Sequence, residues 1–189
     1  KIFHIPFSKI EKIQIYINAK KLTLSQIVKE TGCDYAITGN FYTSDWKPTC
    51  HLKVDGVVKA SDPYNYWGVA FNQGTDIVCC RVPADAKEYK NYYTCCTLIA
   101  NGEKNNSVKY NKDVGGIRGR TGIGATANNL IIYGSSDGSK DAKSPEGLRD
   151  YIVSKEKGIK WFIMGDGGGK VNCYRSEEHT SELQSQFRI

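Results

Sequence analysis

The chain has 189 residues, of which 40% are hydrophobic and 11% aromatic, and its formal net charge at pH 7 is +6. This composition is typical of one globular domain with a packed core and excludes a disordered chain. No apolar run approaches the roughly 18 residues of a membrane span. The 26 Lys and Arg residues are spread along the chain, so the basic stripe of a nucleic-acid-binding protein is not predicted.

The first third of the chain predicts a strand, a helix and a second strand. Apolar and polar residues alternate over residues 13–17, as in a half-buried strand. Thr23 followed by Gln26 is the pattern of a helix capping box, and Gly32 suits the helix end. A further strand is predicted at residues 34–37.

The middle of the chain is rich in predicted strands. Asp55-Gly56, between the strand-like runs 50–54 and 57–60, is a strong signal for a hairpin turn. Further strand-like runs, the last two joined by an Asn-Asn turn, lie at 68–72, 77–81, 92–99, 122–127 and 130–133.

A second helix is predicted to begin at Ser144, with Pro145 in its first turn, and to end at Gly158. It leads into a short apolar run, residues 161–164, which predicts a buried strand ending just before Asp166. Many strands with two amphipathic helices predict a single α+β domain with a mixed multi-stranded sheet.

The seven cysteines form no Cys-x-x-Cys pair and have no histidine at zinc-ligand spacing. No metal and no other cofactor is therefore predicted. An odd number of cysteines also disfavours a complete disulfide framework, so a reducing or anaerobic setting is the expectation.

The C-terminal sequence from Arg175 to Ser185 resembles the translation of a sequencing adapter. We expect residues 1–174 to form the domain and residues 175–189 to be a non-native tail that contributes little to stability. The native chain is then expected to continue beyond Tyr174, so the fold is predicted to be truncated at the C-terminus.

Two segments resemble phosphate-binding motifs but lack residues or elements that those motifs require. Gly169-Lys170 lacks the earlier glycine and the following Ser or Thr of a phosphate loop, because Met164 and Val171 occupy those positions. Gly122-x-Gly124-x-x-Ala127 matches a dinucleotide fingerprint, but a second strand follows it instead of a helix.

An ordered series of short motifs remains. It comprises Thr38-Gly39-Asn40-Phe41-Tyr42, the hairpin 52–58, Gly119-Arg120-Thr121-Gly122-Ile123-Gly124, Asp137-Gly138, the helix start at 146–148 and Gly165-Asp166-Gly167-Gly168-Gly169. Over residues 30–174 this series resembles the phosphodiester glycosidase family, whose usual strings are Asn-Gly-Gly-Phe-Phe, Arg-Thr-Ala-Ile-Gly and Asp-Gly-Gly-Gly-Ser. The chain departs from these strings at Thr38, Asn40 and Lys170.

The resemblance implies a site for a sugar phosphodiester, and the residue chemistry agrees with it. An Arg side chain can bind a phosphate through its fork of N–H groups, which makes Arg120 the candidate, with a structural ion pair as the alternative. A carboxylate at the glycosidic bond can act as general acid or base or stabilise an oxocarbenium ion. Asp166 is the candidate for that role, with turn capping as the alternative.

The remaining substrate-binding candidates surround these two residues. The N–H groups of Gly167, Gly168 and Gly169 are expected to form an anion-binding nest, and Asp137 is expected either to cap a turn or to contact substrate. The rim is predicted to include Thr38, Gly39, Asn40 and Thr121. Four aromatic residues have two possible roles: they either stack on a sugar ring or form part of the core. They are Trp46, Tyr64, Tyr66 and Trp67.

The resemblance therefore implies a hydrolase that cleaves a glycosyl phosphodiester of a cell-surface or exopolysaccharide glycan. The residues themselves leave the location open, and only the resemblance implies the cell surface or secretion. The sequence predicts that Thr38, Arg120 and Asp166 lie on one rim. The alternative is a non-catalytic carbohydrate-binding or cell-wall- or phage-associated module of the same fold. A third interpretation is a structural phage or surface protein with no small ligand. The sequence predicts no oligomeric state.

Overall fold

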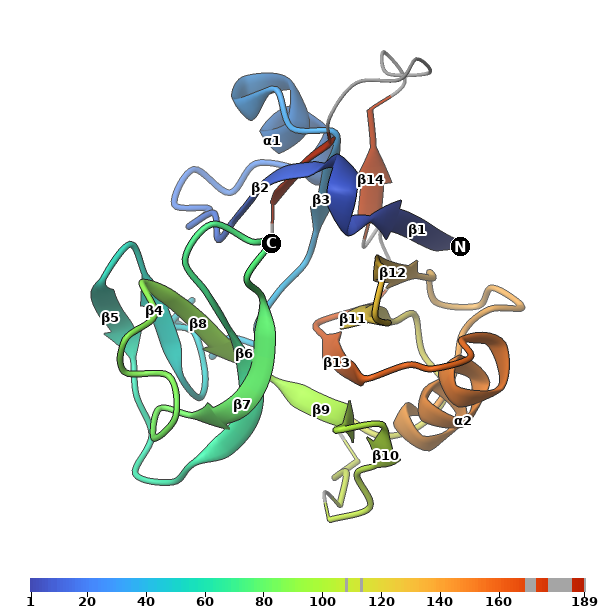
Figure 1. The fold of residues 1–189 in the computed structure, drawn as a ribbon. Helices are drawn as coiled ribbons and strands as arrows, with labels where there is room; N and C mark the ends of the chain where they lie inside the picture. The colour runs from blue at the N-terminus through green and yellow to red at the C-terminus, as the bar shows by residue number, and fades with distance from the viewer. Residues whose placement is uncertain (108, 113, 169–172, 177–184, 189) are drawn as a thin grey trace.

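A computed structural model of the chain describes residues 1–107, 109–112, 114–168, 173–176 and 185–188. Within these ranges the backbone forms three β-sheets, two α-helices and one 3-10 helix, Phe7–Lys9 (Figure 1). The predicted α+β class is confirmed. The strands divide over three sheets, where one mixed sheet was predicted, because strands that follow one another in the sequence often belong to different sheets.

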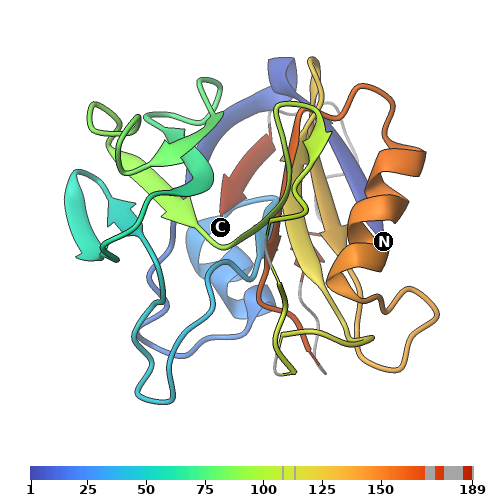
Figure 2. The same ribbon diagram turned by 90° about the horizontal axis from the view of Figure 1, so that it is seen from below.

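The largest sheet has six strands, all antiparallel to their neighbours. Helix α2 (Pro145–Lys155) covers one of its faces and buries Leu148 and Ile152 there (Figure 2). The strands follow the order β1 (Ile2–Pro6), β12 (Asn129–Gly134), β11 (Thr121–Ala125), β13 (Trp161–Gly165), β9 (Cys96–Ala100) and β10 (Glu103–Lys104).

The second sheet has five antiparallel strands and contains the predicted hairpin. Asp55 and Gly56 join its strands with φ angles of +49° and +85°, as a tight hairpin turn of this kind requires. The strand order is β5 (Val57–Ala60), β4 (Leu52–Val54), β8 (Asn91–Thr94), β6 (Tyr66–Phe71) and β7 (Val78–Val82).

The third sheet has four strands and packs against helix α1 (Leu24–Thr31). The helix begins with the predicted capping box of Thr23 and Gln26 and ends at Gly32 with φ +68°. Parallel and antiparallel pairs occur together in this sheet, in the order β14 (Cys173–Arg175), β3 (Tyr35–Ile37), β15 (Ser185–Arg188) and β2 (Ile10–Gln14).

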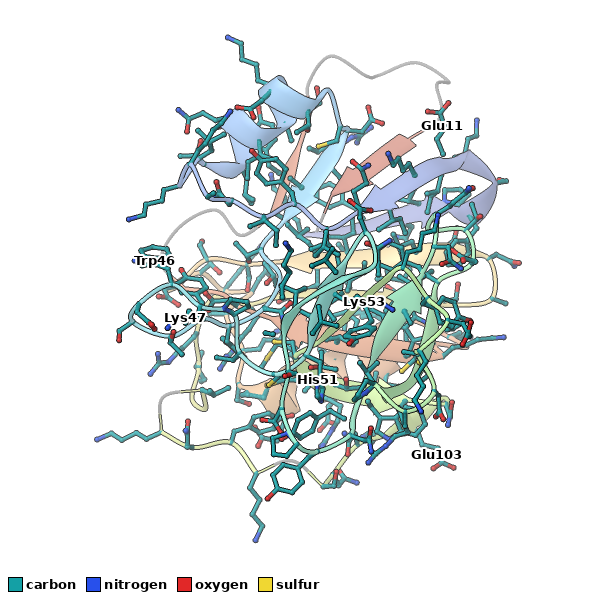
Figure 3. The ribbon with its side chains drawn as sticks, turned by 90° about the vertical axis from the view of Figure 1, so that its left-hand side faces the viewer. Glu11, Trp46, Lys47, His51, Lys53 and Glu103 are labelled. Carbon is teal, nitrogen blue, oxygen red and sulfur yellow. The ribbon has the colours of Figure 1, made fainter. Side chains whose placement is uncertain are left out.

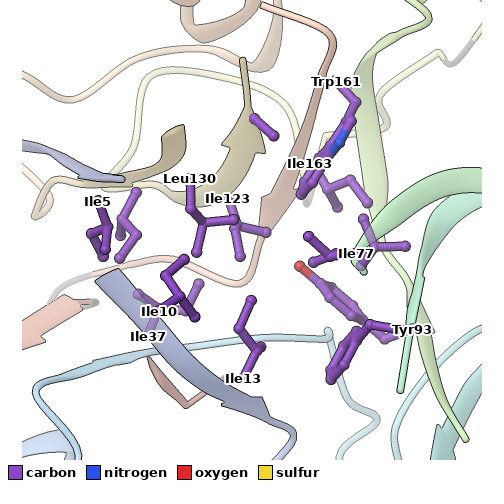
Figure 4. Close-up of a cluster of buried hydrophobic side chains, with 14 of the residues drawn as sticks. Ile5, Ile10, Ile13, Ile37, Ile77, Tyr93, Ile123, Leu130, Trp161 and Ile163 are labelled. Carbon is purple, nitrogen blue, oxygen red and sulfur yellow. The ribbon is translucent and has the colours of Figure 1, made fainter. Parts of the chain in front are cut away.

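One hydrophobic cluster joins the three sheets (Figure 4). Ile13 and Ile37 come from the four-stranded sheet, Tyr93 from the five-stranded sheet, and Ile123 and Ile163 from the six-stranded sheet. The opposite face of the six-stranded sheet packs on α2, so its central strands are buried on both sides. Such strands have continuous apolar sequences, which is why the run 161–164, now β13, could be predicted as a buried strand.

The glycines of β11 also have a packing role. A Cβ atom on Gly124 would lie 2.6 Å from the ring of Phe162 on β13, so the ring needs the space that glycine leaves. This contact accounts for the glycine spacing that only formally matches a dinucleotide fingerprint.

Some sequence-based boundaries were wrong for physical reasons. The apolar run 92–99 divides at Cys95 into β8 and β9, because the chain passes there from one sheet to another while both halves stay buried. The second helix ends at Lys155 instead of Gly158, since Glu156 leaves the helical conformation. Its carboxylate there contacts Nε2 of His4 at 2.9 Å.

The start of the chain also differs from the sequence-based expectation. The strand predicted at residues 13–17 lies at Ile10–Gln14. β1, β10, β14 and β15 were not predicted, and the last of these falls within residues 175–189.

The chain end reaches the four-stranded sheet. The backbone of Ser185–Arg188 pairs in parallel with both β2 and β3, which do not pair with each other. A segment of non-native origin can fill a strand position of this kind, so the boundary at residue 174 stays a prediction.

We expect that ending the chain at Ser176 lowers the melting temperature, because β2 and β3 lose the strand that joins them. A loss of a few kcal/mol corresponds to a drop of roughly 5 °C or more for a domain of this size. Differential scanning calorimetry of the full and shortened chains measures the drop. An unchanged melting temperature would instead support the sequence-based expectation that the tail contributes little.

Candidate active site

The sequence motifs meet where three strands of the six-stranded sheet end together. Thr121 at the start of β11 lies opposite Gly165 at the end of β13 and opposite Gly134 at the end of β12. Residues 119–120, 135–137 and 166–168 therefore leave the sheet side by side. Arg120 and Asp166, which are 46 positions apart in the sequence, are brought next to each other by this register.

The main chain of Asp166 is held from both sides. Its N–H donates to the carbonyl oxygen of Gly39 at 2.9 Å, just beyond β3. Its carbonyl oxygen accepts hydrogen bonds from the hydroxyls of Thr38 and Thr121, each at 2.5 Å. The two hydroxyl oxygens are 3.0 Å apart. These contacts connect the four-stranded sheet to the six-stranded sheet and fix the direction in which the Asp166 side chain leaves the backbone.

The glycines after Asp166 allow two loops to pack closely. A Cβ atom on Gly167 would lie 2.9 Å from the Cα atom of Arg120 and nearer still to the carbonyl oxygen of Gly119. The N–H of Gly168 donates to that carbonyl at 3.1 Å. The Gly167 N–H is bonded to the Asp166 carboxylate. Both N–H groups are thus engaged within the protein, Gly169 lies outside the described residues, and the predicted anion nest stays a prediction.

Asp137 closes the rim on the side of β12. Its carboxylate accepts a hydrogen bond from the Gly119 N–H at 2.5 Å, and its own N–H donates to the Gly168 carbonyl oxygen at 3.3 Å. Asp137 therefore connects the Arg120 loop to the Asp166 loop while remaining exposed to solvent. This is the turn-capping role that the sequence left open, and contact with substrate stays a prediction.

Asp166 is the partly buried carboxylate of this rim. Burial raises its pKa above the ordinary value, while the Gly167 N–H and the positive charge of Arg120 act in the opposite direction. A carboxyl group with a raised pKa, held by a fixed backbone at the end of a sheet, is typical of proton-transfer sites.

Arg120 is buried, with 3% of its surface exposed. Its Nε donates to the Lys143 carbonyl oxygen at 2.9 Å, and one Nη donates to the carbonyl oxygens of Val114 at 2.7 Å and Gly116 at 2.9 Å. Burial lowers its pKa, and the charge of Arg118 adds to this effect. The side chain thus anchors the loop before β11, and its positive charge acts to lower the pKa of Asp166.

Asn40 is the predicted rim residue whose side chain turns elsewhere. Its Nδ2 donates to the carbonyl oxygens of Thr94 at 2.9 Å and Thr49 at 3.3 Å, so it ties two other segments together. The described rim unites the other predicted residues, namely Thr38, Gly39, Arg120, Thr121, Asp137, Asp166, Gly167 and Gly168.

Two neighbours of the rim were not predicted from the sequence. Burial and the charge of Asp166 both raise the pKa of the Tyr42 phenol. The pKa of the Cys96 thiol is lowered by a hydrogen bond from Cys95 and by the charge of Arg120, against the effect of burial. Tyr42 could have been noticed as the last residue of the first motif, whereas Cys96 has no sequence signal because its position follows from the pairing of β9 with β13.

Other features of the structure bear on the kind of site. In the part of the chain that the structure describes, no group of three or more His, Cys, Asp and Glu residues could hold a metal ion. The described helices include none that is long and apolar enough to cross a membrane. The seven cysteines all lie among the described residues, and none of them forms a disulfide there.

Comparison with solved structures shows the same fold in two proteins of low sequence identity. One is the catalytic domain of zebrafish N-acetylglucosamine-1-phosphodiester alpha-N-acetylglucosaminidase, auto-inhibited by its pro-peptide. The match covers 97% of this chain and 68% of the zebrafish chain, with a TM-score of 0.61 and 14% identity. The other is a hypothetical protein from Synechocystis. The match covers 93% of this chain and 52% of the Synechocystis chain, with a TM-score of 0.63 and 8% identity.

Comparison by sequence gives the family. A search of curated proteins finds no significant match. The family model for phosphodiester glycosidase matches residues 31–181, which is most of the chain and includes every residue of the rim. The chain therefore belongs to the phosphodiester glycosidase family of hydrolases.

Proposed function

We propose that this chain hydrolyses a glycosyl phosphodiester of a cell-surface or exopolysaccharide glycan, with Asp166 at the bond that breaks. The observation that carries the proposal is the Asp166 carboxyl group, which has a raised pKa and a main chain held by Thr38, Gly39 and Thr121. The name of the zebrafish relative suggests an N-acetylglucosamine 1-phosphodiester as the first substrate to test.

In the proposed reaction, water attacks the anomeric carbon of the sugar and the bond from that carbon to the phosphate oxygen breaks. The products are the free sugar and a phosphate monoester. A phosphate monoester leaves readily as an anion, so the harder task is to activate the water or stabilise the oxocarbenium-like carbon. Asp166 serves this task in its carboxylate form, and a raised pKa makes it a stronger base.

Arg120 contributes its charge in this proposal. A phosphate diester carries a negative charge, and a buried guanidinium near it is screened little by solvent. Thr38, Gly39, Thr121, Asp137 and the glycines would shape the rim around the phosphate. Arg120 and Asp166 match the family strings, whereas the chain departs from them at Thr38, Asn40 and Lys170, the last of which lies outside the described residues.

One observation favours the non-catalytic carbohydrate-binding module as second candidate. Arg120 already donates to the carbonyl oxygens of Val114, Gly116 and Lys143, so its fork is engaged in holding a loop. A protein that binds a glycan without hydrolysing it would need Arg120 only in this structural role. The two candidates differ in turnover, which the next variants measure.

The Asp166→Asn variant should reduce turnover by roughly 10²-fold or more, because the amide keeps the shape of the side chain but cannot accept the proton or stabilise positive charge. The measurement is release of reducing sugar from the methyl diester of N-acetylglucosamine 1-phosphate and of other hexose 1-phosphates. Asp85→Asn, which changes an exposed carboxylate beyond β7, is the matched control and should leave turnover unchanged. If none of these diesters is hydrolysed by the parent chain, the binding module becomes the better explanation.

The pH dependence of kcat/KM should follow the Asp166 carboxylate. Activity should fall as the pH falls through the raised pKa of Asp166, because the protonated form cannot act as a base. Arg120→Gln removes a positive charge that lowers this pKa, so the acidic limb should move to higher pH. Arg120→Lys keeps the charge and should leave the limb in place. An acidic limb that moves equally in both variants would contradict an electrostatic role of Arg120.

The same Arg120→Lys variant tests the anchoring role. Lysine cannot donate to three carbonyl oxygens in the directions of the guanidinium, so buried acceptors lose partners and stability should fall by about 1–3 kcal/mol. Urea unfolding of the variant measures this change. Arg118→Lys is the matched control, since Arg118 is exposed and its side chain makes a long hydrogen bond, 3.4 Å, to the Lys112 carbonyl oxygen. Equal losses in both variants would show that the buried hydrogen bonds of Arg120 are not the cause.

A further inference from the structure

An exposed pair of aromatic rings lies beside the Asp166 rim. Tyr42 and Trp46 stack with their ring centroids 4.9 Å apart and their planes at 13°. Tyr42 is 49% exposed and Trp46 is 60% exposed, and Figure 3 shows Trp46 at the edge of the molecule. Large aromatic residues usually bury most of their surface, so two adjacent rings that remain this exposed require an explanation.

A short loop holds the two rings together. Tyr42 pairs with Pro48 across the loop, and the Trp46 N–H donates to the Thr43 carbonyl oxygen at 2.9 Å. The N–H of Thr43 in turn donates to the Lys47 carbonyl oxygen at 2.9 Å. The rings are therefore presented by an ordered turn that closes on itself.

Trp46 adopts an unusual backbone conformation in this turn. Its φ angle is +65°, in the left-handed region that bulky residues rarely occupy. The exposed indole gains little burial in return for this strain. Strain at a residue that the core does not need is typical of sites where a side chain is presented to a ligand.

The loop is attached directly to the rim. Gly39, three residues before Tyr42, accepts the hydrogen bond from the Asp166 N–H. Phe41 packs against the buried cluster between the six-stranded sheet and α2. The charge of Asp166 also contributes to the raised pKa of the Tyr42 phenol, so the two groups are near enough to interact electrostatically.

We propose that Tyr42 and Trp46 form a platform on which the sugar ring of the substrate stacks, with its anomeric carbon directed towards Asp166. The inference rests on the proposed function, and it assigns the sugar side of the cleaved bond to this platform. A pyranose has one face made mainly of C–H groups, which packs on an aromatic ring, while its hydroxyls remain in water. Lys21, whose Nζ lies 4.9 Å from the Trp46 ring centroid, is long and flexible enough to move aside and to donate to a sugar hydroxyl.

The other aromatic candidates lack this relation to Asp166. Tyr64 is 68% exposed, but its ring packs edgewise on Tyr66 at 6.5 Å, and its carbonyl oxygen contacts His51. Trp67 is half-buried beneath Arg81. These residues belong to the five-stranded sheet and its loops, and Tyr64 provides an exposed control ring.

Trp46 offers a direct measurement of binding. The chain has three tryptophans, and Trp46 is the exposed one, since Trp161 is buried and Trp67 is half-buried. Titration of the parent chain with N-acetylglucosamine, glucose, galactose and mannose, and with their 1-phosphates, should change the intensity and shift the emission to shorter wavelength for at least one sugar. Trp46→Phe should remove the signal, and Tyr42→Ala should weaken binding by roughly tenfold. Tyr64→Ala should bind as the parent chain does.

Kinetics separate this inference from the proposed function. With a diester that the chain hydrolyses, Tyr42→Ala should raise KM more than it lowers kcat, whereas Tyr64→Ala, the control, should leave both values unchanged. Unchanged KM values in Tyr42→Ala and Trp46→Ala, together with no fluorescence change for any sugar, would overturn the platform while leaving the hydrolase intact. A sugar-dependent Trp46 signal without hydrolysis of any diester would support the platform and reject the hydrolase.

Discussion

The hydrogen bonds that hold the main chain of Asp166 are the interaction on which the site depends. Asp166 follows the last residue of β13, yet its N–H and carbonyl groups are bound by Thr38 and Gly39 from the end of β3 in another sheet. Thr121 adds a bond from the neighbouring strand β11. The ends of two sheets are thereby held at one point. A small relative movement of the sheets would break these bonds and turn the carboxylate away.

The packing around this point explains its rigidity. The shared hydrophobic cluster fills the space between the sheets, and α2 supports the far side of the six-stranded sheet. Close approach of the loops at Gly119 and Gly167 leaves no space for a side chain between them. Arg120 holds the loop before β11 by its bonds to backbone carbonyl groups, and its charge opposes the effect of burial on Asp166. Arg120 thus combines structural anchoring with an electrostatic effect on the carboxylate.

Several parts of the fold could be predicted from local sequence because the cause is local. The capping box of Thr23, the Asp55-Gly56 turn and the doubly buried run of β13 each depend on a few adjacent residues. The crossing at Cys95 could not be predicted, since a strand buried in two successive sheets shows one unbroken apolar pattern. For the site, the ordered motifs predicted that Thr38, Arg120 and Asp166 meet. They did not predict that the hydroxyls of Thr38 and Thr121 bind the Asp166 backbone, or that Asn40 turns to Thr94, because those contacts depend on how the sheets pack.

The central claim is that Asp166 acts at the anomeric carbon of a glycosyl phosphodiester, which makes the reaction a glycoside hydrolysis. The most direct test is hydrolysis of a hexose 1-phosphodiester in water enriched in oxygen-18, with the phosphate product followed by ³¹P nuclear magnetic resonance. Cleavage between carbon and oxygen places the new oxygen on the sugar, so the phosphate monoester should show no isotope shift. An oxygen-18 shift in the phosphate would mean that water attacks phosphorus, and it would contradict the role assigned to Asp166.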